Sequence, residues 1–363
     1  MYSVKIFGAG SIGNHLAHAS RSLGWNVTLC DLDPAALDRA KSMIYPTRYG
    51  KWDNAIKLCL VNEAPKGDFD LILIGTPPDS HLPLALMALE EKPKAILVEK
   101  PLCPPNLENA EKLQSLVTES GTLVFVGYDH VVGKGAQETF HTTQQLKNIE
   151  TIDVEFREHW GGIFAAHPWL SGPQDSYLGF WNRGGGASGE HSHAINLWHF
   201  FSLGLGKGRI IEVSALLDYV KTDGVDYDKL CILSLKTEGG LIGRVVQDVV
   251  TSPPRKWARI QGEDGYVELR MGYQPGVDKV SWKIGKEDSQ FRTIQKTRPD
   301  DFILELEHID SAIKSQDNRS VLCLERGLET MLVVAAAHLS SAKKRAVRLN
   351  YQKGYSPDAL ELL

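Results

Sequence analysis

The sequence predicts an α/β protein with two domains: an N-terminal doubly wound parallel sheet, and a C-terminal α+β domain with a large, mainly antiparallel open sheet. Up to about residue 128, continuous apolar runs alternate with helical patterns, which is typical of parallel strands covered on both faces. From about residue 130, strands alternate apolar and polar residues, as expected for a sheet with one covered face. The predicted domains are residues 1–128 and 129–363, and a length of 363 residues suits two separate cores.

The first predicted strand leads directly into a glycine-rich turn and a helix. Gly8, Gly10 and Gly13 form the spacing G-x-G-x-x-G, and Ser11 and Ile12 complete the turn. In this order of elements, the first glycine allows a tight turn, the second lets the backbone approach a pyrophosphate, and the third lets the helix pack closely on the strand. Free N–H groups at the start of the helix suit the pyrophosphate. The N-terminal domain is therefore predicted to be a Rossmann dinucleotide-binding domain.

Asp31 follows the second predicted strand, residues 25–30. A carboxylate at this place can accept hydrogen bonds from both ribose hydroxyls of NAD, and it would repel the 2′-phosphate of NADP. No arginine follows it immediately, because the next residues are Leu32, Asp33 and Pro34. The predicted cofactor is therefore NAD.

The remaining elements follow from hydrophobic periodicity and from turn residues. In the first domain we expect helices at 11–23, 34–43, 52–60, 82–90 and 106–118, and strands at 70–74, 95–98 and 122–126. In the second domain we expect strands at 151–156, 231–235, 241–250 and 266–269, and helices at 190–201, 302–313 and 327–341.

Composition excludes several classes of partner. The net charge is −5 and no basic run carries interleaved aromatic residues, so no nucleic-acid partner is expected. No apolar stretch is long enough to span a bilayer, and a strand that begins at residue 2 leaves no room for a signal peptide. The five cysteines are scattered without a C-x-x-C pair, which favours reduced thiols and a cytoplasmic location.

Four stretches together carry a resemblance to a known family. They are the Gly8–Gly13 turn with Asp31, the run Thr76-Pro77-Pro78-Asp79-Ser80-His81, the triplet Glu99-Lys100-Pro101, and Gly184-Gly185-Gly186 leading into Glu190-His191-Ser192-His193. In these stretches, and in the ending Lys353-Gly354-Tyr355-Ser356-Pro357, the chain resembles the Gfo/Idh/MocA family of pyridine-nucleotide sugar oxidoreductases. The resemblance implies a dinucleotide domain, a C-terminal sheet domain, and a site for a sugar or polyol between them.

The resemblance also implies roles for single residues. Thr76, Pro77 and His81 resemble residues that line the cofactor near its nicotinamide half, and Glu99 resembles a residue near the nicotinamide ribose. Lys100 resembles the catalytic lysine, which also contacts cofactor and substrate, and Pro101 resembles a proline that often follows a cis bond. His193 resembles the histidine that exchanges the proton of the substrate hydroxyl.

The chain departs from the family pattern in two places. The family usually has an aspartate four residues before the histidine, whereas Glu190 stands three residues before His193, so His191 is an alternative acid/base. After the strand ending near Val126, the family often has an Asn-x-Arg run, whereas this chain has Gly127-Tyr128-Asp129-His130. His130 either takes over a substrate contact or is a polar loop residue.

The chemistry of these residue types agrees with the implied roles. Lys100 follows a buried strand, where its amine can bond an oxygen whose charge changes during hydride transfer. His193 titrates near working pH, which suits removal of a hydroxyl proton, and Glu190 could orient its ring from one helical turn away. A buried structural histidine, a helix-capping cluster or a metal site at Glu190, His191 and His193 are the alternatives, and we predict no metal.

Substrate contacts are predicted at Lys100, Tyr128, His130, Arg157, Trp181, Arg183 and His193. Aromatic faces pack on the C–H surfaces of sugars and arginine binds carboxylate or phosphate, so a sugar with an acidic group is one candidate substrate. Packing tryptophans and solvated arginines are the alternative interpretation.

The predicted function is an NAD-dependent dehydrogenase that acts on a secondary hydroxyl of a sugar, a sugar derivative or a cyclic polyol. One alternative is a glycoside hydrolase that uses transient oxidation by NAD. Another is a non-enzymatic regulator that senses a dinucleotide. By resemblance, we expect a homodimer or homotetramer that pairs through the open face of the C-terminal sheet.

Overall fold

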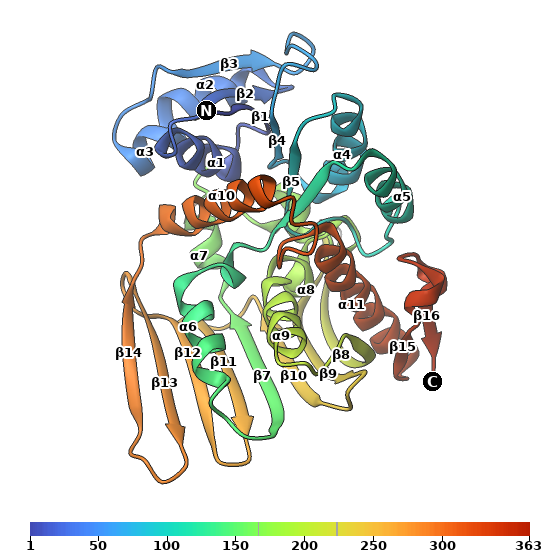
Figure 1. The fold of residues 1–363 in the computed structure, drawn as a ribbon. Coiled ribbons are helices and arrows are strands. Elements are labelled where there is room, and N and C mark those ends of the chain that lie inside the picture. Colours follow the sequence, from blue (N-terminus) through green and yellow to red (C-terminus); the bar gives the residue numbers. More distant parts are fainter. Residues whose placement is uncertain (166, 223) are drawn as a thin grey trace. The chain divides into compact units, whose positions relative to one another are not determined.

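The computed structural model describes residues 1–165, 167–222 and 224–363. These residues form two compact units, which Figure 1 shows coloured along the sequence. The first unit consists of Met1–Cys103, Asn109–Asp129 and Arg298–Gly327, and the second of Pro104–Glu108, His130–Thr297 and Leu328–Leu363. The division of the sequence into domains 1–128 and 129–363 stays a prediction.

The first unit is built on a six-stranded parallel sheet. Its order is β3-β2-β1-β4-β5-β6. The strands are β1 (Ser3–Phe7), β2 (Asn26–Asp31), β3 (Ile56–Leu60), β4 (Leu71–Ile74), β5 (Ala95–Glu99) and β6 (Leu123–Gly127). The strand order reverses between β1 and β4, and ligands of such sheets bind beyond the carboxyl ends of the strands at this reversal. The predicted doubly wound parallel sheet is confirmed.

Six helices belong to this unit: α1 (Ser11–Ser22), α2 (Pro34–Arg39), α3 (Tyr45–Tyr49), α4 (His81–Glu90), α5 (Ala110–Ser120) and α10 (Arg298–Ser315). Between α2 and α3 the chain continues as one π-helical turn, Ala40–Ile44. Helix α1 packs against β1, β2 and α10, and α4 packs against β4, β5 and α5. Strands β1, β4, β5 and β6 are buried along almost their whole length, as continuous apolar runs predict.

The expectation of a helix near residues 52–60 is wrong. Ile56–Leu60 forms β3, which pairs in parallel with β2 at the edge of the sheet. Of its residues only Ile56 is fully buried, because an edge strand has a neighbour on one side only. Lys57 interrupts the apolar run, so periodicity alone fits a helix face as well as a strand. Helix α5 also begins later than expected, after Asn109, which has a φ of 67°.

The second unit is built on a ten-stranded sheet with the order β14-β13-β12-β11-β7-β10-β9-β8-β15-β16. Its strands are β7 (Ile149–Arg157), β8 (Ile210–Thr222), β9 (Val225–Thr237), β10 (Ile242–Asp248), β11 (Arg255–Gly262), β12 (Gly265–Gln274), β13 (Val277–Ile284), β14 (Gln290–Gln295), β15 (Val347–Leu349) and β16 (Leu360–Leu362). Strands β7 and β10 pair in parallel, and the other neighbours pair antiparallel.

Helices cover one face of this sheet. Helix α6 (Lys134–Thr143) packs on β12 and β13, α8 (Gly186–Glu190) on β9 and β10, and α9 (His193–Gly204) on β7 and β10. A short helix α7 (Trp160–Ala165) follows β7, and α11 (Leu324–Lys343) leads from the first unit into the second. Leu216, Ile232 and Ile242 on neighbouring strands are exposed, so the other face is open. The predicted mainly antiparallel open sheet is confirmed. No helix in the described ranges is both long and apolar enough to span a lipid bilayer.

Candidate functional site

Glycine is needed at the start of the turn between β1 and α1 and again in the first helical turn of α1. Gly8 has a φ of 98°, and a Cβ atom there would lie 2.8 Å from the carbonyl oxygen of Gly75. A Cβ atom at Gly13 would lie 1.7 Å from the carbonyl oxygen of Gly8. The first contact comes from the neighbouring strand end, and the second from the close approach of helix and strand. Ile12 lies over Gly75, where a Cβ atom would meet its Cγ2 at 3.2 Å.

Gly10 differs from Gly8 and Gly13, because no contact among the described residues requires a glycine at this position. A Cβ atom at Gly10 would meet no protein atom within 4 Å. Gly10 is also the N-cap of α1, and no side chain caps the free N–H groups of the first turn. An open approach to uncapped N–H groups is what a pyrophosphate needs. The residues of the turn therefore fit a dinucleotide.

Asp31 stands at the end of β2 beside this turn. Its Oδ2 accepts a hydrogen bond of 2.7 Å from the backbone N–H of Ala9, and its Oδ1 accepts one of 3.0 Å from that of Asp33. The side chain remains half-buried. The carboxylate is thus held next to the glycine turn, where each oxygen keeps capacity to accept a further bond from a ribose hydroxyl.

His81 links the loop after β4 to the turn after β5. Its Nε2 lies 2.7 Å from the carbonyl oxygen of Thr76, and its Nδ1 lies 2.9 Å from that of Pro101. The ring is completely buried. Burial lowers the pKa of His81 to about 4, although the two carbonyls oppose this shift. Because a neutral ring donates only one hydrogen bond, it holds one carbonyl firmly at a time. The structure thus gives His81 a positioning role, and its predicted contact with the cofactor stays a prediction.

Glu99 ends β5, Lys100 follows it, and the bond between Lys100 and Pro101 is cis. The Glu99 side chain is buried and folds over the neighbouring strand end, so that a Cβ atom at Gly127 would lie 2.8 Å from its Oε2. Burial and, next, the Asp129 carboxylate raise the pKa of Glu99 to about 8, against the opposing effect of Lys100. At neutral pH Glu99 is therefore mainly a neutral acid, which can donate as well as accept a hydrogen bond.

The other residues predicted in the first unit lie nearby in the fold but differ in access. Thr76 and Pro77 follow β4, where the Thr76 hydroxyl bonds the Ser80 hydroxyl at 2.7 Å, and Pro77 is exposed. Tyr128 follows β6, and only 1% of it is exposed. A side chain so deeply buried packs in the core, so direct contact of Tyr128 with a substrate stays a prediction.

The glycine–histidine segment of the second unit forms two helices instead of one. The helix predicted at 190–201 is present as α9, but it begins later than expected, at His193, because α8 ends at Glu190. His191 and Ser192 form the turn between them. The helical spacing that would place Glu190 one turn from His193 is therefore absent. His191 is 4% exposed and His193 is half-buried, so His193 is the more accessible of the two candidate bases.

His193 and His130 lie together, as the sequence prediction requires if both contact a substrate. Their rings stack with centroids 4.2 Å apart and planes 13° apart. The Phe156 ring on β7 lies beside both, 5.4 Å from His130 and 6.3 Å from His193. A phenyl ring next to two imidazoles provides an apolar wall beside polar groups.

The remaining residues predicted to contact substrate differ in how strongly they already interact with other residues of the protein. Arg157 donates to Asp248 at the end of β10, and this ion pair offsets its charge. Trp181 stacks on His338 at 4.5 Å. Arg183 is exposed, with its guanidinium carbon 5.9 Å from the Phe180 ring centre. Their substrate roles stay predictions, and Arg183 is the most accessible of the three.

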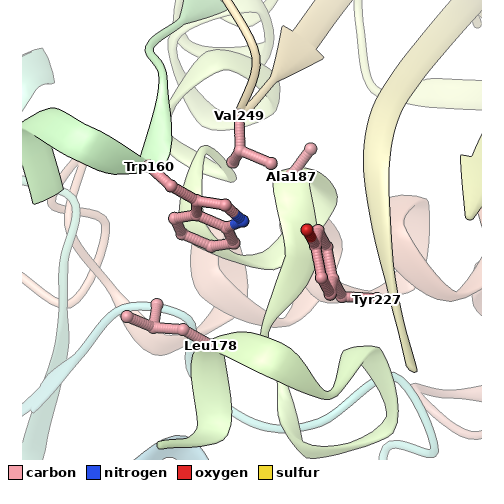
Figure 2. Packing of buried hydrophobic residues seen from close by; sticks show 5 residues of the cluster. All are labelled: Trp160, Leu178, Ala187, Tyr227 and Val249. Atoms are coloured by element: carbon pink, nitrogen blue, oxygen red, sulfur yellow. The ribbon is translucent and has the colours of Figure 1, made fainter. Parts of the chain in front are cut away.

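A buried apolar cluster supports the glycine–histidine segment from one side. Figure 2 shows Trp160, Leu178, Ala187, Tyr227 and Val249 in this cluster. The rings of Trp160 and Tyr227 meet edge-to-face at 5.7 Å. Trp160 is only 8% exposed, so its ring packs in the interior. Ala187 of α8 is held here, immediately after the three glycines.

The third glycine of that run is required by a residue that no sequence motif indicates. Gly186 has a φ of 75°, and a Cβ atom there would lie 2.0 Å from Oδ1 of Asp228. The side chain of Asp228 in turn binds Ser188 of α8. Asp228 lies in an alternating strand outside every predicted motif, so no local signal could have identified it.

Comparisons with known proteins agree with this architecture. Residues 2–128 match the family model of the Gfo/Idh/MocA oxidoreductases, described as an oxidoreductase family with an NAD-binding Rossmann fold. These residues belong to the Gfo/Idh/MocA family. This match confirms the predicted family and fold class. It also confirms the predicted oxidoreductase class, with NAD as the cofactor of that family.

Two solved structures have the same fold over nearly the whole chain. One is levoglucosan dehydrogenase in complex with NADH, with a TM-score of 0.76 and 16% identity, covering 95% of this chain and 98% of that one. The other is an oxidoreductase from Agrobacterium radiobacter in complex with NAD⁺, L-tartaric acid and magnesium, with a TM-score of 0.76 and 18% identity, covering 96% and 98%. At such identities the likeness concerns the fold.

One curated relative is similar over part of its sequence. A glycosyl hydrolase family 109 protein from Shewanella woodyi is 27% identical over 217 residues, which are 50% of this chain and 44% of that protein. The match therefore spans less than half of the relative's length.

Proposed function

We propose that this protein is an NAD-dependent dehydrogenase that oxidises or reduces a secondary hydroxyl of a sugar, a sugar derivative or a cyclic polyol. The observation that carries the proposal is the place of Lys100. It follows the carboxyl end of β5, on the sheet edge where β1 ends in the glycine turn and β2 ends in Asp31. A lysine on the nucleotide-binding edge of such a sheet suits contact with a reacting oxygen.

The proposed catalytic roles divide between Lys100 and His193. NAD, held by the turn between β1 and α1 and by Asp31, would supply the hydride acceptor for oxidation. Lys100 donates a hydrogen bond to the reacting oxygen, and His193 takes the hydroxyl proton as general base. General base help of this kind contributes roughly 10²–10⁴-fold in rate. Neutral Glu99 can donate to a ribose hydroxyl of the nicotinamide half, which fits its raised pKa.

In its most specific form, the proposal is that the substrate carries an acidic group. The exposed guanidinium of Arg183 supports this, because a guanidinium binds carboxylate in a two-pronged geometry. The Agrobacterium radiobacter oxidoreductase, whose structure holds L-tartaric acid, gives further support. A neutral anhydro sugar or polyol is the alternative within the same reaction class.

The test is turnover with NAD on a panel of sugars, sugar acids and cyclic polyols, followed by nicotinamide absorbance. We expect wild type and Lys112→Ala, a matched change of an exposed lysine on α5, to turn over the same compound. Lys100→Ala and His193→Ala should lose at least 100-fold in kcat. Equal turnover by Lys100→Ala and wild type would reject the assignment of Lys100.

A second candidate is a glycoside hydrolase that oxidises and re-reduces its substrate with no net use of NAD. The similarity to the family 109 protein favours it. A chromogenic glycoside distinguishes the two functions. Release of the chromophore without a change in nicotinamide absorbance would support the hydrolase, and net NADH formation from free sugars would support the dehydrogenase.

We also propose a cytoplasmic location and a homodimer or homotetramer. All five cysteines are free thiols, and four of them are buried, which suits a reducing compartment. The exposed apolar residues on the open sheet face support assembly.

A further inference from the structure

Four side chains of the second unit form an unbroken chain of hydrogen bonds. The hydroxyl of Tyr219 on β8 lies 2.6 Å from Nδ1 of His338 on α11. Nε2 of the same histidine lies 3.1 Å from Oγ of Ser188 on α8. Oγ of Ser188 lies 3.1 Å from Oδ1 of Asp228 on β9, and the Ser188 N–H donates to Oδ2 of Asp228 at 2.7 Å. Each distance is that of a hydrogen bond.

This chain of hydrogen bonds connects the protein surface with the interior, because its members differ in burial. Tyr219 is 37% exposed, whereas Ser188 and Asp228 are completely buried and His338 is 6% exposed. The indole of Trp181 stacks on His338 at 4.5 Å and covers the middle of the chain. A Cβ atom at Gly186 would lie 2.0 Å from Oδ1 of Asp228, so the backbone at the start of α8 packs directly against this carboxylate.

Counting protons shows that the chain has a direction. An ionised Asp228 only accepts, so Ser188 donates its hydroxyl proton to it. Nε2 of His338 must then carry a proton and donate to Ser188, which leaves Nδ1 to accept from Tyr219. This requires a neutral ring, and burial indeed lowers the pKa of His338 to about 3. Every donor therefore points toward the carboxylate.

The same chain is complete when Asp228 is protonated. Its Oδ1–H then donates to Ser188, Ser188 donates to Nε2, and Nδ1–H donates to Tyr219, whose hydroxyl turns to water. Burial raises the pKa of Asp228 to about 7, although both bonds from Ser188 oppose this, so both states are within reach near neutral pH. The other ionisable groups that act on the chain are Asp226, which pairs with Lys221 at 3.4 Å, and the buried thiol of Cys231.

We propose that Tyr219, His338 and Ser188 conduct protons between solvent and the buried carboxyl of Asp228, and that Asp228 and Ser188 are positioning residues for the turn that leads to His193. To load Asp228, a hydronium ion gives a proton to the Tyr219 oxygen and the Tyr219 proton passes to Nδ1. The Nε2 proton then passes to Ser188, and the Ser188 proton passes to Oδ1. Four bonds to hydrogen break and four form, and the negative charge on Asp228 is neutralised.

The connection to His193 runs through α8. Asp228 holds the first turn of this five-residue helix by the N–H and hydroxyl of Ser188, and α8 ends at Glu190, three residues before His193. The hydrogen bonds reverse their direction without moving any side chain, so Asp228 holds α8 in both of its charge states. This part rests on the proposed function of His193, whereas the proton path does not.

The path is tested on the whole protein by infrared spectroscopy after a pH jump, without substrate. The carboxylic C=O band assigned to Asp228 is the one that Asp228→Asn removes. In Tyr219→Phe, which keeps the ring, we expect this band to appear at least ten-fold more slowly than in wild type, with an unchanged midpoint. Tyr266→Phe, a change of another tyrosine hydroxyl on β12, should behave as wild type. Equal rates in Tyr219→Phe and wild type would overturn the path, as would the absence of any band that Asp228→Asn removes.

The positioning role has a separate readout. Asp228→Asn keeps an acceptor for Ser188, whereas Asp228→Ala removes it. We expect His193 to keep its NMR chemical shifts in Asp228→Asn and to change them in Asp228→Ala. Unchanged shifts in Asp228→Ala would overturn the positioning role, whatever the substrate proves to be.

Discussion

At the scale of single residues, burial decides which ionisable groups are charged. Glu99 is 4% exposed and has the Asp129 carboxylate as a neighbour, and both effects raise its pKa to about 8. Asp248, which is also buried, behaves in the opposite way. Burial would raise its pKa, but hydrogen bonds from Arg157 and Thr251 hold that pKa below the ordinary value. Specific partners therefore separate two carboxyls that burial alone would treat alike.

Glu99 predicts a pH dependence of stability. Its pKa in the folded state is raised from the model-compound value of 4.5 to about 8, so the folded state binds the proton more tightly. The stabilising effect of that proton is fully present below about pH 4.5 and is lost as the pH rises to 8. Glu99→Gln cannot ionise, so its free energy of unfolding should fall less than that of wild type between pH 5.5 and 8.5. Urea unfolding at several pH values measures this, and parallel curves would contradict it.

Asp31 predicts the choice of cofactor. Its carboxylate is held beside the glycine turn by the N–H groups of Ala9 and Asp33. Hydrogen bonds to a charged group contribute about 1.5–3 kcal/mol, so Asp31→Ser should bind NAD roughly 10- to 100-fold more weakly. The same change removes a repulsive charge and should improve NADP binding. Calorimetric titration with both cofactors checks this, and tighter binding of NADP than NAD by wild type would refute it.

At the scale of elements, local patterns predict what local forces determine. The β1–turn–α1 unit follows from its glycines, and the Asp33–Pro34 start of α2 follows from an N-cap that bonds Ala35. Strand β3 could not be predicted in this way, because its place beside β2 is a contact between distant segments. The chain from Tyr219 to Asp228 joins four elements, and for the same reason no motif indicates it.

A buried ion pair joins the start of the sheet to the end of α4. Lys5 of β1 is 1% exposed, and its ammonium lies 2.7 Å from Oε2 of Glu91, with the Phe69 ring 4.7 Å away. Removing one partner of such a pair leaves a buried charge uncompensated. Glu91→Gln should therefore lower the free energy of unfolding by about 3 kcal/mol. The double variant Lys5→Met, Glu91→Gln should lose less, because no buried charge remains. Urea unfolding gives both values, and an equal or larger loss in the double variant would contradict this account.

At the scale of the whole molecule, the open face of the ten-stranded sheet exposes apolar side chains on neighbouring strands. Leu216 and Ile232 are directly paired across β8 and β9, and they are 73% and 39% exposed. The half-buried Val246 continues the row on β10. An apolar row of this kind, exposed on two strands and half-buried on a third, is typical of a surface that another protein covers.

This row predicts the assembly state. Wild type should be a dimer or tetramer by light scattering, and Ile232→Glu should shift it toward monomer, because a carboxylate would be buried without a partner. Asn318→Glu makes the same change of charge at an exposed turn and should leave the assembly intact. A monomeric wild type would contradict the prediction.

The central claim concerns the whole protein: NAD binds on the turn between β1 and α1. Gly10 allows the most direct test, because a methyl group there meets no protein atom within 4 Å and would meet only a bound pyrophosphate. The measurement is calorimetric titration of NAD into Gly10→Ala and wild type, with the melting temperature of each protein in the absence of NAD as the control. We predict nearly equal melting temperatures and at least ten-fold weaker binding by the variant. Equal affinity of Gly10→Ala and wild type for NAD would contradict the account.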